Sequence, residues 1–434
     1  MSITQETSTS LADATPTGGR VTDDEVGAAA TDYSQFDGVE IFDADQHMYE
    51  TRDAVLKFLP DEFRGAVQFV DIEGRTKISI LGKTTDYIPN PTFDVVAAPG
   101  AHELFYSGTN TEGKTLRELS GKPIRSIPAF RTPEARVEML DKFGVAQTLN
   151  YPTLANLVEA SAAANPDLVH AIIHGLNQWM LETWSFNYQD RVYSTPVISM
   201  PDLDKALAEL EWAAENGAKC VLIKPAPVHS WQGWRSPALP HYDPFWARVQ
   251  ELDMPVVFHG SQPPLMDYVD MWETADTNSA FSQSAFKYIA LGHREISDMM
   301  ASLICHGTLT RFPHLRIASV ENGSSWLEPL LNDLDALYHK MPNAFDEHPV
   351  EVFRRNIWVS PFWEGSVSDV MSTVGGDKVL FGSDYPHPEG LAEPRGYFKY
   401  SQGLKKDDTV RFMGDNTRTF LGFDTIGSPP AGHG

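Results

Sequence analysis

The chain has 434 residues, of which 42% are hydrophobic and 21% are charged, close to the average of globular proteins. This composition excludes a collagen-like, coiled-coil or wholly disordered protein. The 34 basic and 59 acidic residues give a net charge of −25, which argues against binding to nucleic acid or to an anionic membrane surface. The length suits two or three ordinary domains or one large α/β barrel.

The cysteines and the N-terminus bear on the compartment. Cys220 and Cys305 are too few for a disulfide framework or a cysteine zinc cluster. We expect no membrane span, because no run reaches the roughly 18 apolar residues that one needs. The first residues lack the basic and apolar regions of a secretory signal. We therefore expect a cytoplasmic protein that acts on a small molecule.

Three parts of the chain differ in composition. Residues 1–38 are rich in Ser, Thr, Ala, Asp and Gly, which predicts a flexible tail or an arm that orders against a partner subunit. Residues 39–425 are predicted to form the folded domain. Residues 426–434 are predicted to be a C-terminal tail.

After the N-terminal tail, short apolar runs alternate with helical patterns. Over 204–216, for example, Ala206, Leu210 and Ala213 recur at helical spacing, and Gly217 ends the pattern. Eight runs are typical of strands buried on both faces: Val39–Asp45, Val145–Tyr151, Val192–Ile198, Cys220–Lys224, Val256–His259, Leu315–Val320, Ile357–Ser360 and Val379–Gly382. Eight such units predict an α/β fold of the (β/α)8 TIM-barrel type, although a doubly wound open sheet gives the same alternation.

The region 67–130 interrupts this alternation between the first and second predicted strands. It contains a hairpin pattern, Val67–Ile72 and Lys77–Leu81 around Glu73-Gly74, followed by a Pro/Gly-rich stretch. We interpret it as an insertion that serves as a lid or a dimer contact, or as an inert surface elaboration. Because isolated hairpins are marginally stable, we expect a homo-oligomer, most simply a dimer, formed through this insertion or the tail.

Polar residues stand at the ends of three predicted strands. Asp45 and His47 are two residues apart and can face the same point, His259 follows one apolar run, and Asp384 follows another. Each alone fits a hydrogen-bonded core histidine or a capping aspartate. In a barrel, however, the carboxyl ends of the strands meet around one pocket. Carboxylates and imidazoles are ligands for divalent metals, so the joint placement predicts a metal site.

Four segments, FDADQHMYE, VVFHG, RFPHLRIASVENGSSW and VLFGSDYPH, carry a family resemblance. Over 39–421 the chain resembles the amidohydrolase superfamily, in the branch that contains aminocarboxymuconate semialdehyde decarboxylase and γ-resorcylate decarboxylase. The resemblance implies a TIM barrel and no organic cofactor. It also implies one divalent metal, most readily zinc but also manganese or iron, held by Asp45, His47, His259 and Asp384.

One position departs from the family. The histidine that usually follows the sixth strand is replaced by Glu321. Three interpretations stay open: Glu321 is a catalytic base beside Asp384, a metal ligand, or a carboxylate paired with an arginine.

Several residues are candidates for substrate contacts. Lys224 ends the fourth predicted strand, where it can meet an anionic substrate group, hold a second metal if carboxylated, or extend into solvent. Phe362 and Tyr151 can form an aromatic wall, and His306 flanks the helical stretch 295–304. The substrate-binding candidates are Lys224, His293, His387 and Trp363.

These features favour a metal-dependent hydrolase that acts on a small cyclic or carboxylated substrate. In that reaction the metal activates a water and Asp384 receives its proton. A cofactor-independent, non-oxidative decarboxylase is the alternative. The carboxylate at position 45 favours the decarboxylase, and the missing sixth-strand histidine favours the hydrolase. A non-catalytic barrel used for binding is a third possibility.

Overall fold

The computed structural model describes residues 36–423, apart from 86, 263–264, 274–283, 363–365 and 402. Three predictions concern residues outside these ranges: most of the N-terminal tail (1–35), the C-terminal tail (426–434) and Trp363.

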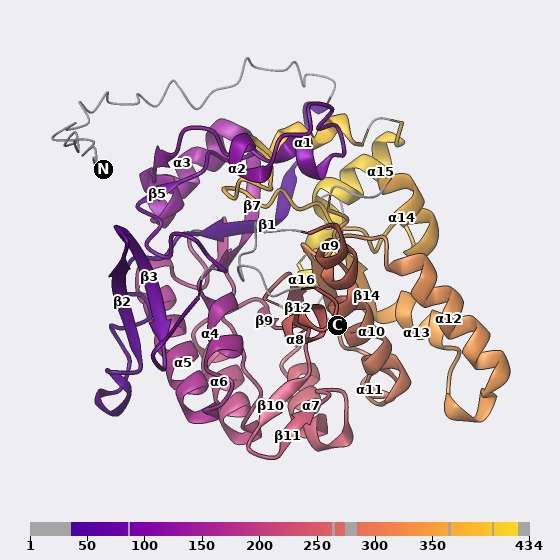
Figure 1. The fold of residues 1–434 in the computed structure, drawn as a ribbon. Helices are drawn as coiled ribbons and strands as arrows, with labels where there is room; N and C mark the ends of the chain where they lie inside the picture. The colour runs from indigo at the N-terminus through magenta and orange to yellow at the C-terminus, as the bar shows by residue number, and fades with distance from the viewer. Residues whose placement is uncertain are drawn as a thin grey trace, which may run out of the picture.

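Parallel strands lie at the centre of the molecule and form two sheets (Figure 1). Strand β1 pairs with β7 and β7 with β8, while β9, β12, β13 and β14 pair in that order. Their bounds are β1 Ile41–Met48, β7 Val145–Pro152, β8 Val192–Ser194, β9 Val221–Ile223, β12 Val256–His259, β13 Ile317–Val320 and β14 Ile357–Val359.

Backbone hydrogen bonds close the two gaps between these sheets. After β8, the Ile198 amide donates to the Leu222 carbonyl at 2.8 Å. After β14, the segment 379–385 takes the eighth position: Leu380 N donates to Val359 O at 2.9 Å, and Ala44 N donates to Phe381 O at 2.8 Å. The ring therefore closes as in a TIM barrel, and the open-sheet alternative is wrong.

The strand bounds differ from the prediction where local chemistry intervenes. Strand β1 continues to Met48, so that Asp45 and His47 lie within the strand and not at its end. Strand β8 stops at Ser194 because Pro196 has no amide hydrogen to donate. The eighth segment makes isolated bridges at Val379 and Tyr385, and its backbone turns left-handed at Asp384 (φ 55°).

Helices cover the outside of the ring (Figure 1). Asp202 caps α6 by accepting hydrogen bonds from the amides of Asp204 and Lys205. The helix therefore begins at Leu203, one residue before the predicted start. The longer helices are α3 Pro133–Phe143, α5 Pro166–Trp184, α6 Leu203–Glu215, α7 Asp243–Glu251, α10 Arg294–Cys305, α12 Leu327–Lys340, α13 Pro349–Asn356 and α14 Val367–Val374. Among the helices described, none is both long enough and apolar enough to cross a membrane.

The insertion packs on its own barrel. The predicted hairpin is strands β2 and β3, and its residues Val67, Ile78 and Ile80 are buried in the core of the same chain. These side chains need no partner subunit to cover them, and the homo-oligomer remains a prediction. The elements of the insertion are β2 Val67–Ile72, β3 Arg75–Ile80, β4 Lys83–Thr85, β5 Val95–Val96, β6 Ile124–Arg125, α1 Glu103–Tyr106 and α2 Leu116–Leu119.

The second half of the insertion reaches the rim of the barrel. The His102 amide donates to the Pro388 carbonyl at 2.7 Å, in the loop that follows the eighth segment. Gly100 permits this approach, because it adopts φ +73° and a Cβ there would lie 2.6 Å from the Ala392 nitrogen. This hydrogen bond therefore holds the insertion against the loop that carries His387.

Candidate metal centre

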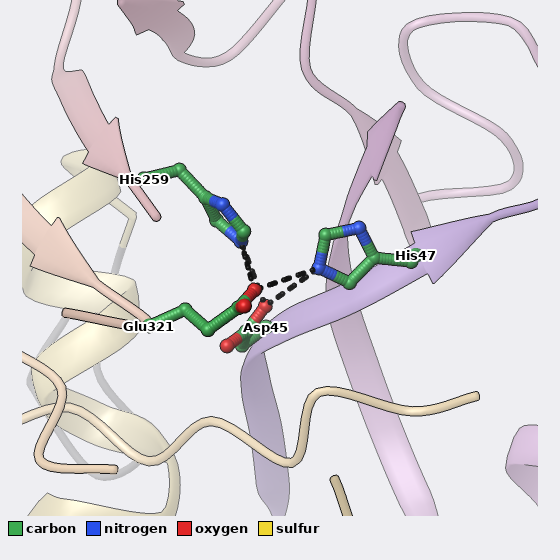
Figure 2. Close-up of side chains that lie close together, drawn as sticks. All are labelled: Asp45, His47, His259 and Glu321. Atoms are coloured by element: carbon green, nitrogen blue, oxygen red, sulfur yellow. Dashed lines mark hydrogen bonds and ion pairs between the residues drawn. The ribbon is translucent and has the colours of Figure 1, made fainter. Parts of the chain in front are cut away.

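Four segments place acidic and imidazole side chains at one point on the rim. Asp45 and His47 come from β1, and His259 is the last residue of β12. Glu321 follows β13 directly, and Asp384 follows the eighth segment. Figure 2 shows that His47, His259, Asp45 and Glu321 point toward a common centre.

The contacts at this centre are close. His259 Nε2 lies 3.0 Å from Glu321 Oε2 and 3.3 Å from Asp45 Oδ1. His47 Nε2 lies 3.3 Å from the same Glu321 oxygen and 3.4 Å from Asp384 Oδ1. One ligand atom from each of Asp45, His47, His259 and Glu321 lies within 4.8 Å of the others, and we call these four residues the quartet.

The quartet fits a divalent cation. His259 Nδ1 lies 2.9 Å from the Gly260 carbonyl, to which it can only donate, so neutral His259 turns the lone pair of Nε2 toward two carboxylates. The space between Nε2 and these carboxylates is filled either by a proton on Nε2 or by a bound cation. Among the described residues, His47 Nε2, Glu321 Oε2 and both Asp384 oxygens are buried without a hydrogen-bond partner. Two nitrogen and two oxygen donors in a buried site suit zinc, manganese or iron.

The ionisation of these groups shows where positive charge is favoured. Burial lowers the pKa of His259, but the carboxylates of Glu321 and Asp45 outweigh it and raise that pKa to about 10. Burial likewise opposes ionisation of Glu321, yet His259 and His47 hold its pKa well below its usual range. The carboxylates of the quartet therefore stabilise positive charge at its centre.

Asp384 behaves differently. Burial, together with the nearby carboxylates of Glu321 and Glu389, raises the pKa of Asp384 well above its usual range. Its Oδ1 lies 2.9 Å from His387 Nδ1, and burial lowers the pKa of His387 well below its usual value. A carboxyl of high pKa beside a neutral imidazole is suited to hold and release a proton.

Thr153 fixes the tautomer of His387. The Thr153 hydroxyl donates to the Met48 carbonyl at 2.9 Å, so it can only accept from His387 Nε2, which lies 3.2 Å away. A neutral His387 that carries its hydrogen on Nε2 has its lone pair on Nδ1, facing Asp384. The lone pair of the imidazole therefore lies close to the Asp384 carboxyl.

Two residues that sequence reasoning missed hold β1 in place. Asp43 accepts hydrogen bonds from the Ser383 amide at 2.9 Å and from Gln46 Nε2 at 2.8 Å. Burial raises the pKa of Asp43 to about 7, although these hydrogen bonds oppose the rise. Arg136 on α3 donates to the His47 carbonyl at 2.7 Å, to the Ala129 carbonyl at 2.7 Å and to Gln46 Oε1 at 3.0 Å.

We expect Arg136→Met to lower the free energy of unfolding by about 3–5 kcal/mol, because three buried acceptors lose their donor. Urea denaturation of the metal-free protein measures this loss without a contribution from bound metal. Arg64→Met is the matched control, since the Arg64 side chain is 72% exposed. A change below about 1 kcal/mol for Arg136→Met, as is usual for surface substitutions, would contradict this structural role.

The remaining predicted residues are spread around the centre. His293 Nδ1 lies 2.9 Å from the Asn322 carbonyl beside Glu321, whereas His306 is exposed at the opposite end of α10. Tyr151 lies beneath the quartet, with its ring 4.8 Å from that of His259 and its hydroxyl donated to the Ala44 carbonyl. The ring of Phe362 contacts Tyr106 of the insertion at 5.6 Å.

Lys224 has acidic neighbours that sequence reasoning did not anticipate. Burial lowers the pKa of Lys224, and the carboxylates of Glu159 and Glu295 oppose that change. Burial raises the pKa of Glu295 to about 8. Lys224 therefore interacts with two acidic groups from other segments, which no local sequence pattern reveals.

Comparisons with known proteins agree with this architecture. The family profile described as amidohydrolase matches residues 128–423. An amidohydrolase from Mycobacterium avium subsp. paratuberculosis K-10 shares 33% identity over 88% of this chain and 99% of its own, with a TM-score of 0.84. No curated protein matches the chain.

More distant solved structures share the fold. A 5-carboxyvanillate decarboxylase from Novosphingobium aromaticivorans DSM 12444, complexed with manganese and 4-hydroxy-3-methoxy-5-nitrobenzoic acid, is 16% identical over 89% of this chain and 97% of its own (TM-score 0.57). A dihydroxybenzoic acid decarboxylase from Polaromonas sp. JS666, with manganese and 2-nitroresorcinol, is 16% identical over 88% and 97% (TM-score 0.55).

A closed α/β barrel with a buried His/Asp/Glu cluster on its rim defines a class of metal-dependent enzymes. Within that class, this chain belongs to the amidohydrolase family, which confirms the resemblance of the sequence.

Proposed function

We propose that the chain is a metal-dependent hydrolase of a small aromatic or carboxylated substrate. The quartet would hold the cation, zinc or manganese, with Asp384 close enough to complete its coordination. A cation there supplies Lewis acidity to a water molecule or to a substrate oxygen.

Asp384 is the observation that carries the proposal. Its carboxyl is fully buried, has a raised pKa and lies 2.9 Å from His387 Nδ1. As the base, Asp384 accepts a proton from the water that attacks the substrate carbonyl. It then returns a proton to the leaving group, while His387 orients the carboxyl and shares the charge.

A second candidate, non-oxidative decarboxylation, is favoured by the solved relatives that are decarboxylases of aromatic acids. The same residues would then act in the reverse sense. Protonated Asp384 would donate its proton to the ring carbon as the bond between the ring and the carboxylate breaks, and CO₂ would leave.

Isotope labelling distinguishes the two reactions. The protein, loaded in turn with zinc and with manganese, is incubated with aryl esters, anilides, lactones and hydroxybenzoates in H₂¹⁸O and, separately, in D₂O. Hydrolysis places one ¹⁸O atom in the product acid. Decarboxylation instead releases CO₂ and places deuterium on the ring carbon. Labelled ring carbon with no labelled acid would replace the hydrolase by the decarboxylase, and no turnover with either metal across the panel would favour the binding-only barrel.

A further inference from the structure

A cavity of about 240 Å³ lies beside the quartet and has no part in the mechanism above. It lies near the carboxyl end of β9, under the hairpin formed by β10 (Val228–Ser230) and β11 (Gly233–Arg235). Its wall includes Val169, Met200, Ala226, Val228 and Trp234. Residues of the barrel rim and of the β10–β11 hairpin therefore form the wall of the cavity.

The lining is apolar apart from a few polar side chains, most of which already have partners. Glu159 accepts a hydrogen bond from Ser199 Oγ at 2.6 Å and interacts electrostatically with Lys224. His229 Nδ1 lies 2.7 Å from the Ala163 carbonyl, to which it donates. Gln262 also lines the cavity, and among the described residues its buried Oε1 has no hydrogen-bond partner. The cavity therefore offers an occupant mainly apolar contact, with Gln262 Oε1 as an unpaired acceptor.

The cavity lies next to the quartet. A smaller hollow is lined by His259 and Ser261 on one side and by Glu159, Ile223 and Lys224 on the other. The last three residues also line the large cavity. These three side chains therefore lie between the hollow beside His259 and the large cavity.

We propose that this cavity is a second substrate subsite, which takes an apolar group such as a second aromatic ring or a branched alkyl chain. The inference rests on the proposed function for the position of the reacting group. An apolar cavity of about 150 Å³ holds one benzene molecule, so this cavity has room for a substituted ring.

Binding of three carboxylates to the metal-loaded protein tests the subsite. Benzoate, 4-tert-butylbenzoate and biphenyl-4-carboxylate differ only in the apolar group opposite the carboxylate. Burial of that group is expected to tighten binding of biphenyl-4-carboxylate by about tenfold or more relative to benzoate. Isothermal titration calorimetry measures the ratio of the two dissociation constants. Equal constants in the unmodified protein would overturn the subsite.

Two cavity-filling variants locate the effect. Ala226→Phe fills the cavity from its wall, and Val228→Trp narrows it from the partly exposed β10 strand. Each is expected to bring the ratio close to unity. Ala208→Phe, at an exposed position of α6, is the matched control and should keep the ratio of the unmodified protein.

Metal content and thermal unfolding show whether each variant folds. If Ala226→Phe does not fold, Val228→Trp alone tests the subsite. A ratio that survives both substitutions would overturn the assignment to this cavity. The titrations involve no turnover, so failure of the proposed reaction in the isotope experiment would leave their result unaffected.

Discussion

Replacement of His259 by alanine is expected to abolish tight metal binding. The imidazole is one of the two nitrogen donors of the quartet, and its Nε2 lies 3.0 Å from Glu321 and 3.3 Å from Asp45. Without it, the carboxylates face each other with one donor fewer to hold the cation. Elemental analysis after gel filtration should give about one metal ion per chain for the unmodified protein and a small fraction of that for His259→Ala.

His306→Ala is the matched control, because His306 is exposed at the end of α10 far from the quartet. It should keep the full metal content. Thermal unfolding with and without a chelator supplies a second measurement: the chelator should lower the transition temperature of the unmodified protein and of His306→Ala but leave that of His259→Ala unchanged. A folded His259→Ala protein with full metal content would refute the ligand assignment.

Substitutions of Asp384 and Glu321 are expected to distinguish the residue that carries the proton from the residues of the quartet that hold the metal. Asp384→Asn removes the group that exchanges a proton with the substrate, so turnover should fall by about 10²–10⁴-fold. Metal content should fall only partly, because the quartet remains. Glu321→Gln should instead empty the site, because the Glu321 carboxylate contacts both His47 and His259. Turnover and metal content are measured on the same preparations.

Asp253→Asn is a matched control for the aspartate, since Asp253 also has a positive φ (50°) and its side chain is 80% exposed. It should change neither turnover nor metal content. Full turnover in Asp384→Asn would refute its role as the proton carrier. Full metal content together with reduced turnover in Glu321→Gln would make Glu321 a catalytic base and not a ligand.

The barrel could be predicted from the sequence because buried parallel strands are continuous apolar runs. Val256-Val257-Phe258, for example, is buried at every position. The prediction was less accurate where the backbone departs from a regular strand. Pro196 interrupts the third position, and the eighth is held by hydrogen bonds between segments that no local pattern reports.

The same distinction applies to the site. Asp45, His47 and His259 could be predicted because strand geometry fixes where their side chains point. The position of Glu321 depends on a left-handed backbone (φ 57°) just after β13, and its contacts are with histidines, with no arginine among the ion pairs described for it. Arg136 lies in an ordinary helical pattern, and its role depends on where α3 packs against β1.

The join between the first strand and the eighth segment determines when the site can form. Asp384 N donates to Asp45 O at 2.8 Å and Ser383 N donates to Asp43 at 2.9 Å, across more than three hundred residues of chain. During synthesis the first half of the quartet therefore emerges from the ribosome long before the residues that hold it in place. The hydrogen bonds that hold Asp43 and Asp45 cannot form until the eighth segment has been synthesised, and a nascent or truncated chain that lacks this segment has no closed barrel.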